Sequence, residues 1–366
     1  MGRAYAAAGV DYAKIAAFKR AMVELCEHTR EFPLRRRVEV SATGSLEYLD
    51  AGFIPHRWRV VSEGLGTKSW IAEWMYKETG DPRYFAGIGI DAAMMAVVDL
   101  LRYGALPVGY TDVISAGESE WFADEARRDV IRESFYEACR MAGMAMLGGE
   151  SEPLRYLVKP TPPLTRAPVF SGAAIGLIAP AENEIRPDRL VPGAQILGVP
   201  SSGVHANGLS LVVEKGLTLP DKFLTPLPTG RLLGEEALIP TRSYVALVEK
   251  LLETKCEILS IVPATGGGIT KIALQGKPYT YRITRWVEVP YLFEFLNHHG
   301  VPYHEGLKIF NWGIGLYLLV PEDAVSRVIA TGKIAGYELY HLGWVEKGER
   351  KVIFEPEGIE LSPPGT

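Results

Sequence analysis

The stretch that decides the fold is GIGIDAAMMAVVDLLRYGALPVGYTDVISAG, residues 87–117. Within it, small and apolar residues such as Met95 and Ala96 recur at helical spacing, and Gly104 stands where a helix would end. Residues 106–110, which follow, are apolar enough for a buried strand. We therefore predict a helix and then a strand, which is the alternation of an α/β fold.

Three carboxylates, Asp91, Asp99 and Asp112, lie in or next to these predicted elements. A carboxylate on an apolar segment is costly unless a charge or hydrogen bonds compensate it. Magnesium, which prefers oxygen ligands, is one partner that would do so. Ordinary roles are open as well: Asp91 as a helix N-cap, Asp99 as a solvated side chain and Asp112 as a turn residue.

Length and composition limit the class of protein. A chain of 366 residues is longer than one domain usually is, and the polar, proline-bearing segment 181–192 predicts a boundary between domains 1–181 and 182–366. The net charge of −5 argues against a general nucleic-acid binder, and no apolar run is long enough to cross a bilayer. Three widely spaced cysteines fit neither a disulfide framework nor a zinc site. We therefore expect a soluble cytoplasmic protein that binds neither nucleic acid nor membrane.

Two segments of the first half have residues suited to phosphate binding. Residues 64–68, G-L-G-T-K, follow a predicted strand and could offer N–H groups and a lysine charge, although the spacing is not that of a Walker A loop. A flexible turn is the alternative. Residues 148–150, G-G-E, place a carboxylate at the end of another predicted strand. The run Arg35-Arg36-Arg37 is either a solvated face or, less often, a phosphate contact.

Two loops of the second half have a similar character. Residues 201–208, S-S-G-V-H-A-N-G, gather hydroxyls, an imidazole and an amide ahead of a predicted helix, which suits an anionic ligand. His205 could equally be a structural hydrogen-bonding residue. Residues 265–268, T-G-G-G, permit close approach of a ligand to the backbone.

In their order along nearly the whole chain, these segments resemble the aminoimidazole ribonucleotide synthetase family, also called phosphoribosylformylglycinamidine cyclo-ligases. The resemblance implies a two-domain α/β fold with an N-terminal domain for ATP binding and dimerisation and a C-terminal domain for substrate binding. It also implies a homodimer in which the N-terminal domains pair their sheets. The matching residues are Ala8-Gly9-Val10-Asp11, 64–68, Gly89-Ile90-Asp91 with Asp99, Asp112, 148–150, 201–208, Pro240-Thr241-Arg242, 265–268 and Phe310-Asn311-Trp312-Gly313-Ile314-Gly315.

The resemblance also implies an activity in de novo purine biosynthesis, with ATP and a phosphoribosyl compound as substrates and Mg²⁺ as cofactor. ATP would phosphorylate the formyl oxygen of formylglycinamidine ribonucleotide, and the amidine nitrogen would then close the imidazole ring. The implied catalytic residues are Lys68, Asp91 and His205, and the implied magnesium ligands are Asp91, Asp99 and Glu150. The implied ATP-binding residues are Gly64, Gly66, Thr67, Lys68, Asp112, Gly148, Gly149 and Glu150. The implied substrate-binding residues are Ser201, Ser202, His205, Asn207, Thr265, Gly266 and Gly267.

The chain departs from the family pattern in four places. Glu63 stands where the family usually has aspartate, and Ala264 stands where many members have histidine before the T-G-G-G run. Residues 41–56 lack the family's glycine-rich segment, and residues 271–283 lack its E-N-I-P-R run. These departures leave two alternatives to the cyclo-ligase. One is another ATP-dependent phosphotransferase of the superfamily, similar to thiamine-phosphate kinase or selenophosphate synthetase. The other is a nucleotide-binding paralogue without catalytic activity.

Overall fold

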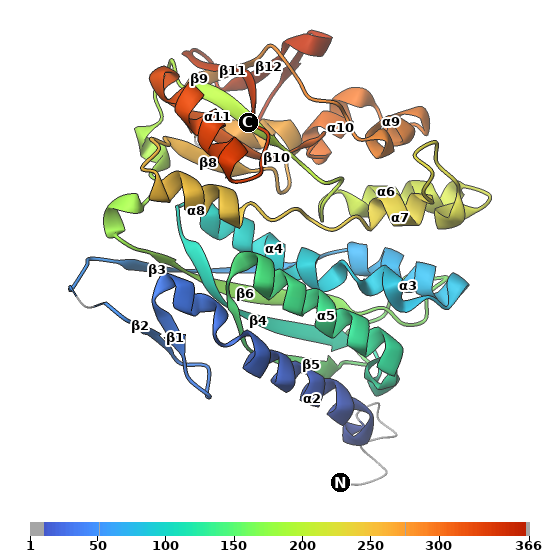
Figure 1. Ribbon diagram of the computed structural model, residues 1–366. Helices are drawn as coiled ribbons and strands as arrows, with labels where there is room; N and C mark the ends of the chain where they lie inside the picture. The colour runs from blue at the N-terminus through green and yellow to red at the C-terminus, as the bar shows by residue number, and fades with distance from the viewer. Residues whose placement is uncertain (1–10, 51, 275, 364–366) are drawn as a thin grey trace.

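Two large β-sheets with their helices build most of the molecule, and one lies above the other in Figure 1. The computed structural model describes residues 11–50, 52–274 and 276–363. Ala8, Gly9 and Val10 of the motif near the N-terminus therefore lie outside the described residues.

The first half of the chain folds around a four-stranded sheet with the order β3-β6-β4-β5. Strand β6 pairs antiparallel with β3 and β4, and β5 pairs parallel with β4. A hairpin of β1 and β2 stands beside this sheet. The strands are β1 (Val38–Val40), β2 (Leu46–Tyr48), β3 (Arg57–Gly64), β4 (Leu106–Ala116), β5 (Ala145–Pro153) and β6 (Val169–Ile178). The α-helices described here are α2 (Tyr12–Thr29), α3 (Lys68–Thr79), α4 (Ile88–Leu101) and α5 (Glu125–Ala142).

The second half folds around a seven-stranded sheet with the order β13-β12-β9-β11-β7-β10-β8. All neighbouring strands in it are antiparallel except β12 and β9. The strands are β7 (Gln195–Pro200), β8 (Ser260–Pro263), β9 (Tyr279–Ile283), β10 (Ile314–Val320), β11 (Tyr340–Lys347), β12 (Lys351–Phe354) and β13 (Ile359–Leu361). The α-helices are α6 (Leu209–Thr218), α7 (Leu233–Ala237), α8 (Val245–Glu253), α9 (Tyr291–His298), α10 (Tyr303–Ile309) and α11 (Val325–Ile334).

Helix α4 lies between the two sheets (Figure 1) and packs against β3 and β6 on one side and α8 on the other. All of its residues except Asp99 are buried. The segment Pro82–Leu101 is long and apolar enough to cross a membrane, with a mean hydropathy of 1.6, but 89% of it lies inside the protein. Burial of this kind is that of a core helix, and the apolar core continues from α4 into both halves.

The stretch 87–117 forms the predicted helix and strand, but both are longer than predicted. Helix α4 begins at Ile88, so Asp91 lies in the first turn and is not the N-cap, which is Gly87. Strand β4 continues to Ala116 because it pairs with β6 and β5, which places Asp112 inside the strand and not in a turn. Strand β5 follows β4 as far as Pro153, so residues 148–150 also belong to a strand.

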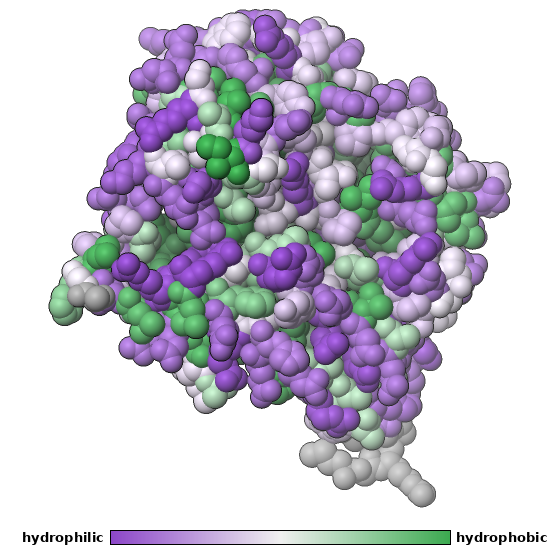
Figure 2. All heavy atoms as spheres, in the orientation of Figure 1, coloured by the Kyte–Doolittle hydropathy of each residue, from purple (hydrophilic) through white to green (hydrophobic). Residues whose placement is uncertain are grey.

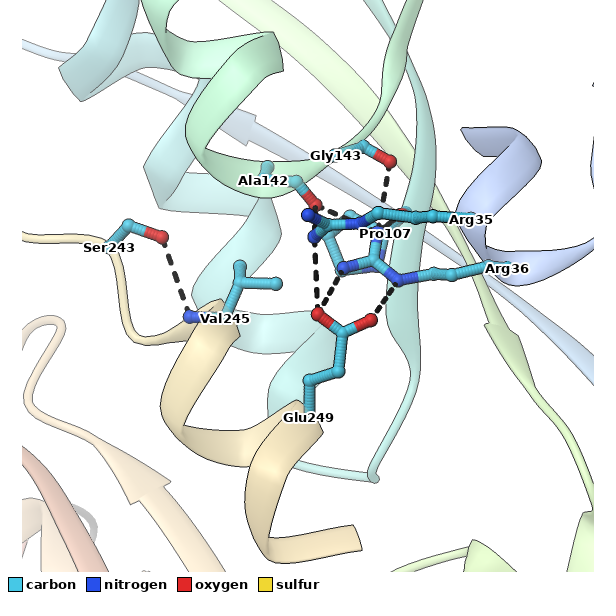
Figure 3. A network of polar contacts seen from close by, with 8 residues as sticks. All are labelled: Arg35, Arg36, Pro107, Ala142, Gly143, Ser243, Val245 and Glu249. Atoms are coloured by element: carbon cyan, nitrogen blue, oxygen red, sulfur yellow. Dashed lines mark hydrogen bonds and ion pairs between the residues drawn. The ribbon is translucent and has the colours of Figure 1, made fainter. Parts of the chain in front are cut away.

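Arg36 and Glu249 join the first half of the chain to α8 (Figure 3). Nε and Nη2 of Arg36 donate to the Glu249 carboxylate at 2.9 and 3.1 Å. Nη1 donates to the carbonyl oxygens of Pro107, Ala142 and Gly143, in β4 and at the end of α5. Burial lowers the pKa of Arg36 to about 10, and Glu249 opposes that shift. Arg36 is therefore neither a solvated residue nor a phosphate contact, but holds the two halves together.

Candidate active site

One face of α4 points toward the second half of the chain. Asp91, Met95 and Asp99 follow at intervals of four residues, which places their side chains on the same side of the helix, and we call them the α4 face. Asp91 is fully buried, and its Oδ1 accepts hydrogen bonds from the backbone N–H and from Oγ1 of Thr241 at 2.8 and 2.5 Å. The first position of the α4 face is thus fixed to the loop before α8.

The other two positions of the α4 face meet two loops that the sequence indicates for ligand binding. Nδ2 of Asn207 lies 3.8 Å from Sδ of Met95, and Oγ1 of Thr265 donates to Oδ1 of Asp99 at 3.4 Å. The two loops also meet each other, because a Cβ added to Gly266 would lie 3.7 Å from Oδ1 of Asn207. The structure therefore brings loops 201–208 and 265–268 together over α4.

Lys68 is the cation at the Asp91 end of this site. Its Nζ lies 2.8 Å from Oδ2 of Asp91, and both side chains are 0% exposed. Nζ also donates to the carbonyl oxygens of His205 and Ile239 at 3.0 and 2.7 Å. Burial raises the pKa of Asp91 and lowers that of Lys68, while each partner's charge opposes the shift. The ammonium is thus enclosed by one carboxylate and two carbonyl oxygens, and its charge is already compensated in this arrangement.

His205 occupies a constrained position in loop 201–208. Its φ of 61° is left-handed, a conformation that a residue with a Cβ seldom adopts. Its Nε2 accepts the backbone N–H of Ser202 at 3.3 Å, which assigns the proton of the neutral ring to Nδ1. Burial, with the charges of Lys68 and Arg242, lowers the pKa of His205 to about 3, so the ring is neutral at pH 7. This geometry is that of a structural hydrogen-bonding residue, and a catalytic role for His205 stays a prediction.

Asn311 shapes the same loop, a role that the sequence did not reveal although its F-N-W-G-I-G run is part of the family pattern. Its Nδ2 donates to the carbonyl oxygen of Gly203 at 2.8 Å, and its Oδ1 accepts from Oγ of Ser201 at 3.2 Å. Ser202 is held separately, because its Oγ donates to the carbonyl oxygen of Pro240 at 2.5 Å. Loop 201–208 is therefore held by Asn311, which lies between α10 and β10, by Lys68 of α3 and by the carbonyl oxygen of Pro240.

The glycines of loops 64–68 and 265–268 allow backbone shapes that other residues would resist. Gly266, Gly267 and Gly268 have φ of 66°, 76° and 53°, and a Cβ on Gly268 would lie 2.2 Å from the carbonyl oxygen of Leu307. Loop 64–68 runs from β3 into α3, and Oγ1 of its Thr67 lies 2.7 Å from Oγ of Ser210 in α6. Both loops therefore lie at the contact between the two halves.

A second group of predicted residues lies between β4 and β5, near α2. Asp112 pairs in register with Gly149 and Val113 with Glu150. The buried side chain of Asp112 lies over Gly149, and a Cβ added to Gly149 would lie 1.9 Å from Oδ1 of Asp112. This Oδ1 has no hydrogen-bond partner in the described part of the chain. Burial, with a smaller effect of Glu150, raises the pKa of Asp112 to about 7. Glu150 itself is exposed and pairs with Lys19 of α2 at 2.7 Å.

Comparison with known proteins connects this geometry with a family. Models of the N-terminal and C-terminal domains of AIR synthase related proteins match residues 54–178 and 191–355. A phosphoribosylformylglycinamidine cyclo-ligase of Pyrococcus horikoshii is 30% identical over 363 residues, which cover 98% of this chain and 99% of that protein. The chain belongs to the AIR synthetase family. A protein of the same name from Brevibacillus brevis is 31% identical and covers 98% of this chain and 100% of its own length.

Solved structures share the fold of this AIR synthetase family member. A thiamine-monophosphate kinase from Stenotrophomonas maltophilia has a TM-score of 0.60 at 16% identity, covering 91% of this chain and 96% of its own. The hydrogenase maturation protein HypE of E. coli has a TM-score of 0.60 at 16% identity, covering 93% and 97%. At such identities the likeness concerns the fold alone.

The carboxylates predicted to bind magnesium in this AIR synthetase do not converge. Asp91 and Asp99 are eight residues apart on α4, which is about 12 Å along the helix axis. Asp91 is already paired with Lys68, and Glu150 is paired with Lys19. Among the residues that the structure describes, no group of three or more His, Cys, Asp or Glu side chains could hold a metal ion. Asp91, Asp99 and Glu150 therefore do not form one metal site within the chain, and magnesium binding stays a prediction.

The predicted site residues thus separate into two groups. The first surrounds the α4 face and consists of Gly64, Gly66, Thr67, Lys68, Asp91, Asp99, Ser201, Ser202, His205, Asn207, Thr265, Gly266 and Gly267. The second lies between β4 and β5 and consists of Asp112, Gly148, Gly149 and Glu150. Thr241 belongs with the first group, because it binds Asp91. In the sequence, Thr241 stood out only as part of the family motif Pro240-Thr241-Arg242.

Proposed function

We propose that the chain catalyses the ATP-dependent closure of formylglycinamidine ribonucleotide to aminoimidazole ribonucleotide, with release of ADP and phosphate. The observation that carries the proposal is the meeting, over the α4 face, of loops 64–68, 201–208 and 265–268 from both halves of the chain. Similarity to cyclo-ligases over almost the full chain supports the choice of this reaction.

The proposed reaction has two steps whose atoms balance. The formyl oxygen attacks the γ-phosphorus of ATP, and ADP leaves. The amidine nitrogen then attacks the activated carbon, loses a proton, and the phosphate leaves with the former formyl oxygen as the ring closes. Such phosphoryl transfer requires positioning and neutralisation of charge more than covalent help from the protein.

The residues around the α4 face are suited to positioning. Lys68 holds the carbonyl of His205, and Asp91 holds Thr241, so the buried ion pair fixes loop 201–208 against the first half. We propose that this loop and loop 265–268 hold the phosphoribosyl substrate through backbone N–H groups. The neutral His205 could accept a proton in the second step only after Nε2 leaves the N–H of Ser202.

We also propose that magnesium enters with ATP, because the phosphate charges need a cation. The predicted trio of carboxylates does not fit one ion, so no step of the mechanism is assigned to it. Asp112 is the predicted ATP-binding carboxylate outside the ion pairs that Asp91 and Glu150 form, and its Oδ1, which has no hydrogen-bond partner among the described residues, supports a ligand there.

We further propose that the chain forms a homodimer in the cytoplasm through the open face of the first sheet. Trp58, Val60 and Val169 lie on this face of β3 and β6 and are 38%, 64% and 50% exposed. Figure 2 shows that the surface on the visible side is mostly polar, with apolar residues in small groups. Apolar residues gathered on one sheet face support an interface with a second sheet.

The proposed function is tested by following ADP and aminoimidazole ribonucleotide together, with purified protein, Mg-ATP and formylglycinamidine ribonucleotide. Equal amounts of the two products are expected. Thiamine monophosphate is the matched acceptor for the phosphotransferase alternative, and no ADP is expected with it. ADP formed without the imidazole, or with thiamine monophosphate instead, would overturn the proposal.

A further inference from the structure

Lys271 is a cation that neither the sequence motifs nor the proposed function uses. It lies in the 3₁₀ helix Gly268–Ala273, directly after the glycines of loop 265–268, and is partly buried. Its Nζ donates to both the carbonyl oxygen and Oγ1 of Thr265, the first residue of that loop. The side chain of Lys271 thus extends back past the glycines and connects the two ends of the loop.

The contact continues to the first half of the chain. The hydroxyl of Thr265 accepts a hydrogen bond from Nζ of Lys271 and donates one to Oδ1 of Asp99 at 3.4 Å. The result is a chain of ammonium, hydroxyl and carboxylate, which we call the Lys271–Thr265–Asp99 chain. It connects loop 265–268 to the last position of the α4 face.

Two carboxylates near Lys271 stabilise its ammonium form, against the larger effect of burial. The carboxylates of Asp99 in α4 and Glu63 in β3 raise its pKa, whereas the charge of Arg102, the residue after α4, lowers it. Burial is the largest effect and lowers the pKa of Lys271, and burial followed by the charge of Asp99 raises the pKa of Glu63. Removing the ammonium would therefore take away a cation that both carboxylates attract.

The loop needs such a connection. Gly266, Gly267 and Gly268 all have positive φ, and glycine loses more conformational freedom on ordering than any other residue. Glycines also have no side chains with which to hold the loop in place. Apart from Lys271, the far end of the loop is held by Oγ1 of Thr270, which donates to the carbonyl oxygen of Gly267 at 2.6 Å.

We propose that Lys271 is a positioning residue, which fixes loop 265–268 in its substrate-binding shape through the Lys271–Thr265–Asp99 chain. This inference rests on the proposed function for the identity of the substrate, but not for the ordering of the loop. Lys271 opens the segment 271–283, where the chain departs from the family pattern.

Two measurements on the purified full chain test the inference. Lys271→Met keeps the length of the side chain but removes its charge and donors, whereas Lys271→Arg keeps both. With Lys271→Met we expect the KM for formylglycinamidine ribonucleotide to rise about tenfold, the size of a lost charged hydrogen bond, with the KM for ATP unchanged. We also expect faster amide hydrogen exchange in residues 264–274, and Lys271→Arg should restore both properties.

Lys277→Met is the matched control, because Nζ of Lys277 also donates to two backbone carbonyls, those of Asp188 and Leu190, but outside the loop. It should change neither KM nor exchange in 264–274. Thr265→Val interrupts the chain in its middle, and the double variant with Lys271→Met should exchange no faster than either single variant. Effects that do not add would show that both variants break the same connection, so the test does not depend on the folding of a single variant.

The outcomes separate the inference from the proposed function. Unchanged exchange in Lys271→Met would overturn the positioning role, whatever the activity. Faster exchange with equal rises in both KM values would overturn the assignment of the loop to the phosphoribosyl substrate. If the wild type does not turn over at all, the proposed function fails, while the exchange experiment still decides whether Lys271 orders the loop.

Discussion

Asp91 and Thr241, 150 residues apart, are joined through one carboxylate oxygen: Oδ1 of Asp91 accepts hydrogen bonds from both the backbone N–H and the hydroxyl of Thr241. The other oxygen pairs with Lys68. One buried carboxylate thereby joins α4, α3 and the loop before α8. This relationship makes Asp91 a residue that holds the halves together, and the α4 face the place where a ligand would meet both.

Asp91→Asn should destabilise the fold. The variant leaves the buried ammonium of Lys68 without its charge partner, and loss of one partner of a buried pair typically costs about 3–5 kcal/mol. The free energy of unfolding from urea titration measures this loss. Glu253→Gln is the control, because its pair with Lys250 is exposed, and we expect a change below about 0.5 kcal/mol there. Equal stabilities of the two variants would contradict the assignment.

Arg36→Met should also weaken the contact between the halves. It removes three hydrogen bonds to carbonyl oxygens and the buried partner of Glu249, which keeps only its contact with the more exposed Arg35, so we expect a loss of about 3 kcal/mol in the free energy of unfolding. Arg35→Met removes a neighbouring guanidinium that is 44% exposed and shares Glu249, and it should cost about 1 kcal/mol or less. A larger effect at Arg35 than at Arg36 would show that the buried contact is not the important one.

Asp112 should make the protein less stable as the pH rises. Its pKa is about 7 in the folded chain and 3.8 without the burial, so between these values the folded state holds a proton that the unfolded state has lost. Stability is then fully present below pH 4 and falls until about pH 7. Asp112→Asn removes this dependence.

The measurement is urea unfolding at pH 5 and pH 8. Relative to wild type, Asp112→Asn should gain about 2 kcal/mol between these two pH values. Glu150→Gln serves as control, since Glu150 is exposed and its pKa is lowered by Lys19, so the difference from wild type should not change over this range. A constant difference for Asp112→Asn would mean that its carboxylate is already charged at pH 5.

His205 should stay neutral from pH 8 to pH 5. Its folded pKa of about 3 lies below the ordinary 6.5, so the unfolded chain takes up the proton first and stability is lost as the pH falls from 6.5 toward 3. ¹⁵N chemical shifts of the imidazole should report the tautomer with the proton on Nδ1 and no titration over this range. The urea-unfolded chain is the reference, in which histidine titrates near 6.5. Titration of His205 near 6.5 in the folded protein would contradict the buried acceptor geometry.

The sequence predicted the helix and strand within residues 87–117 and singled out the loops that meet over the α4 face, because helical spacing and glycine positions are local signals. It did not predict the length of β4, which depends on partners on both sides and moves Asp112 from a turn into a strand. Nor did it predict the meeting of Asp99 with Thr265, 166 residues apart. Such contacts depend on how the two halves pack.

The charged residues show the same limit. A lysine after two glycines is typical of a phosphate-binding loop, yet Lys68 is enclosed by Asp91 and two carbonyl oxygens. Arg36 belongs to a run that local rules assign to the solvated surface, but Glu249 and the end of α5 enclose it. Burial of a charge depends on partners far away in the chain, so the residue type alone gives no sign of it.

The reaction proposed for the site is tested most directly with formylglycinamidine ribonucleotide labelled with ¹⁸O in the formyl group. If the formyl oxygen attacks ATP and leaves as phosphate, each aminoimidazole ribonucleotide formed should be accompanied by one inorganic phosphate carrying ¹⁸O, which mass spectrometry measures. Label that stays in the organic product or appears in water, with unlabelled phosphate from ATP, would contradict the account.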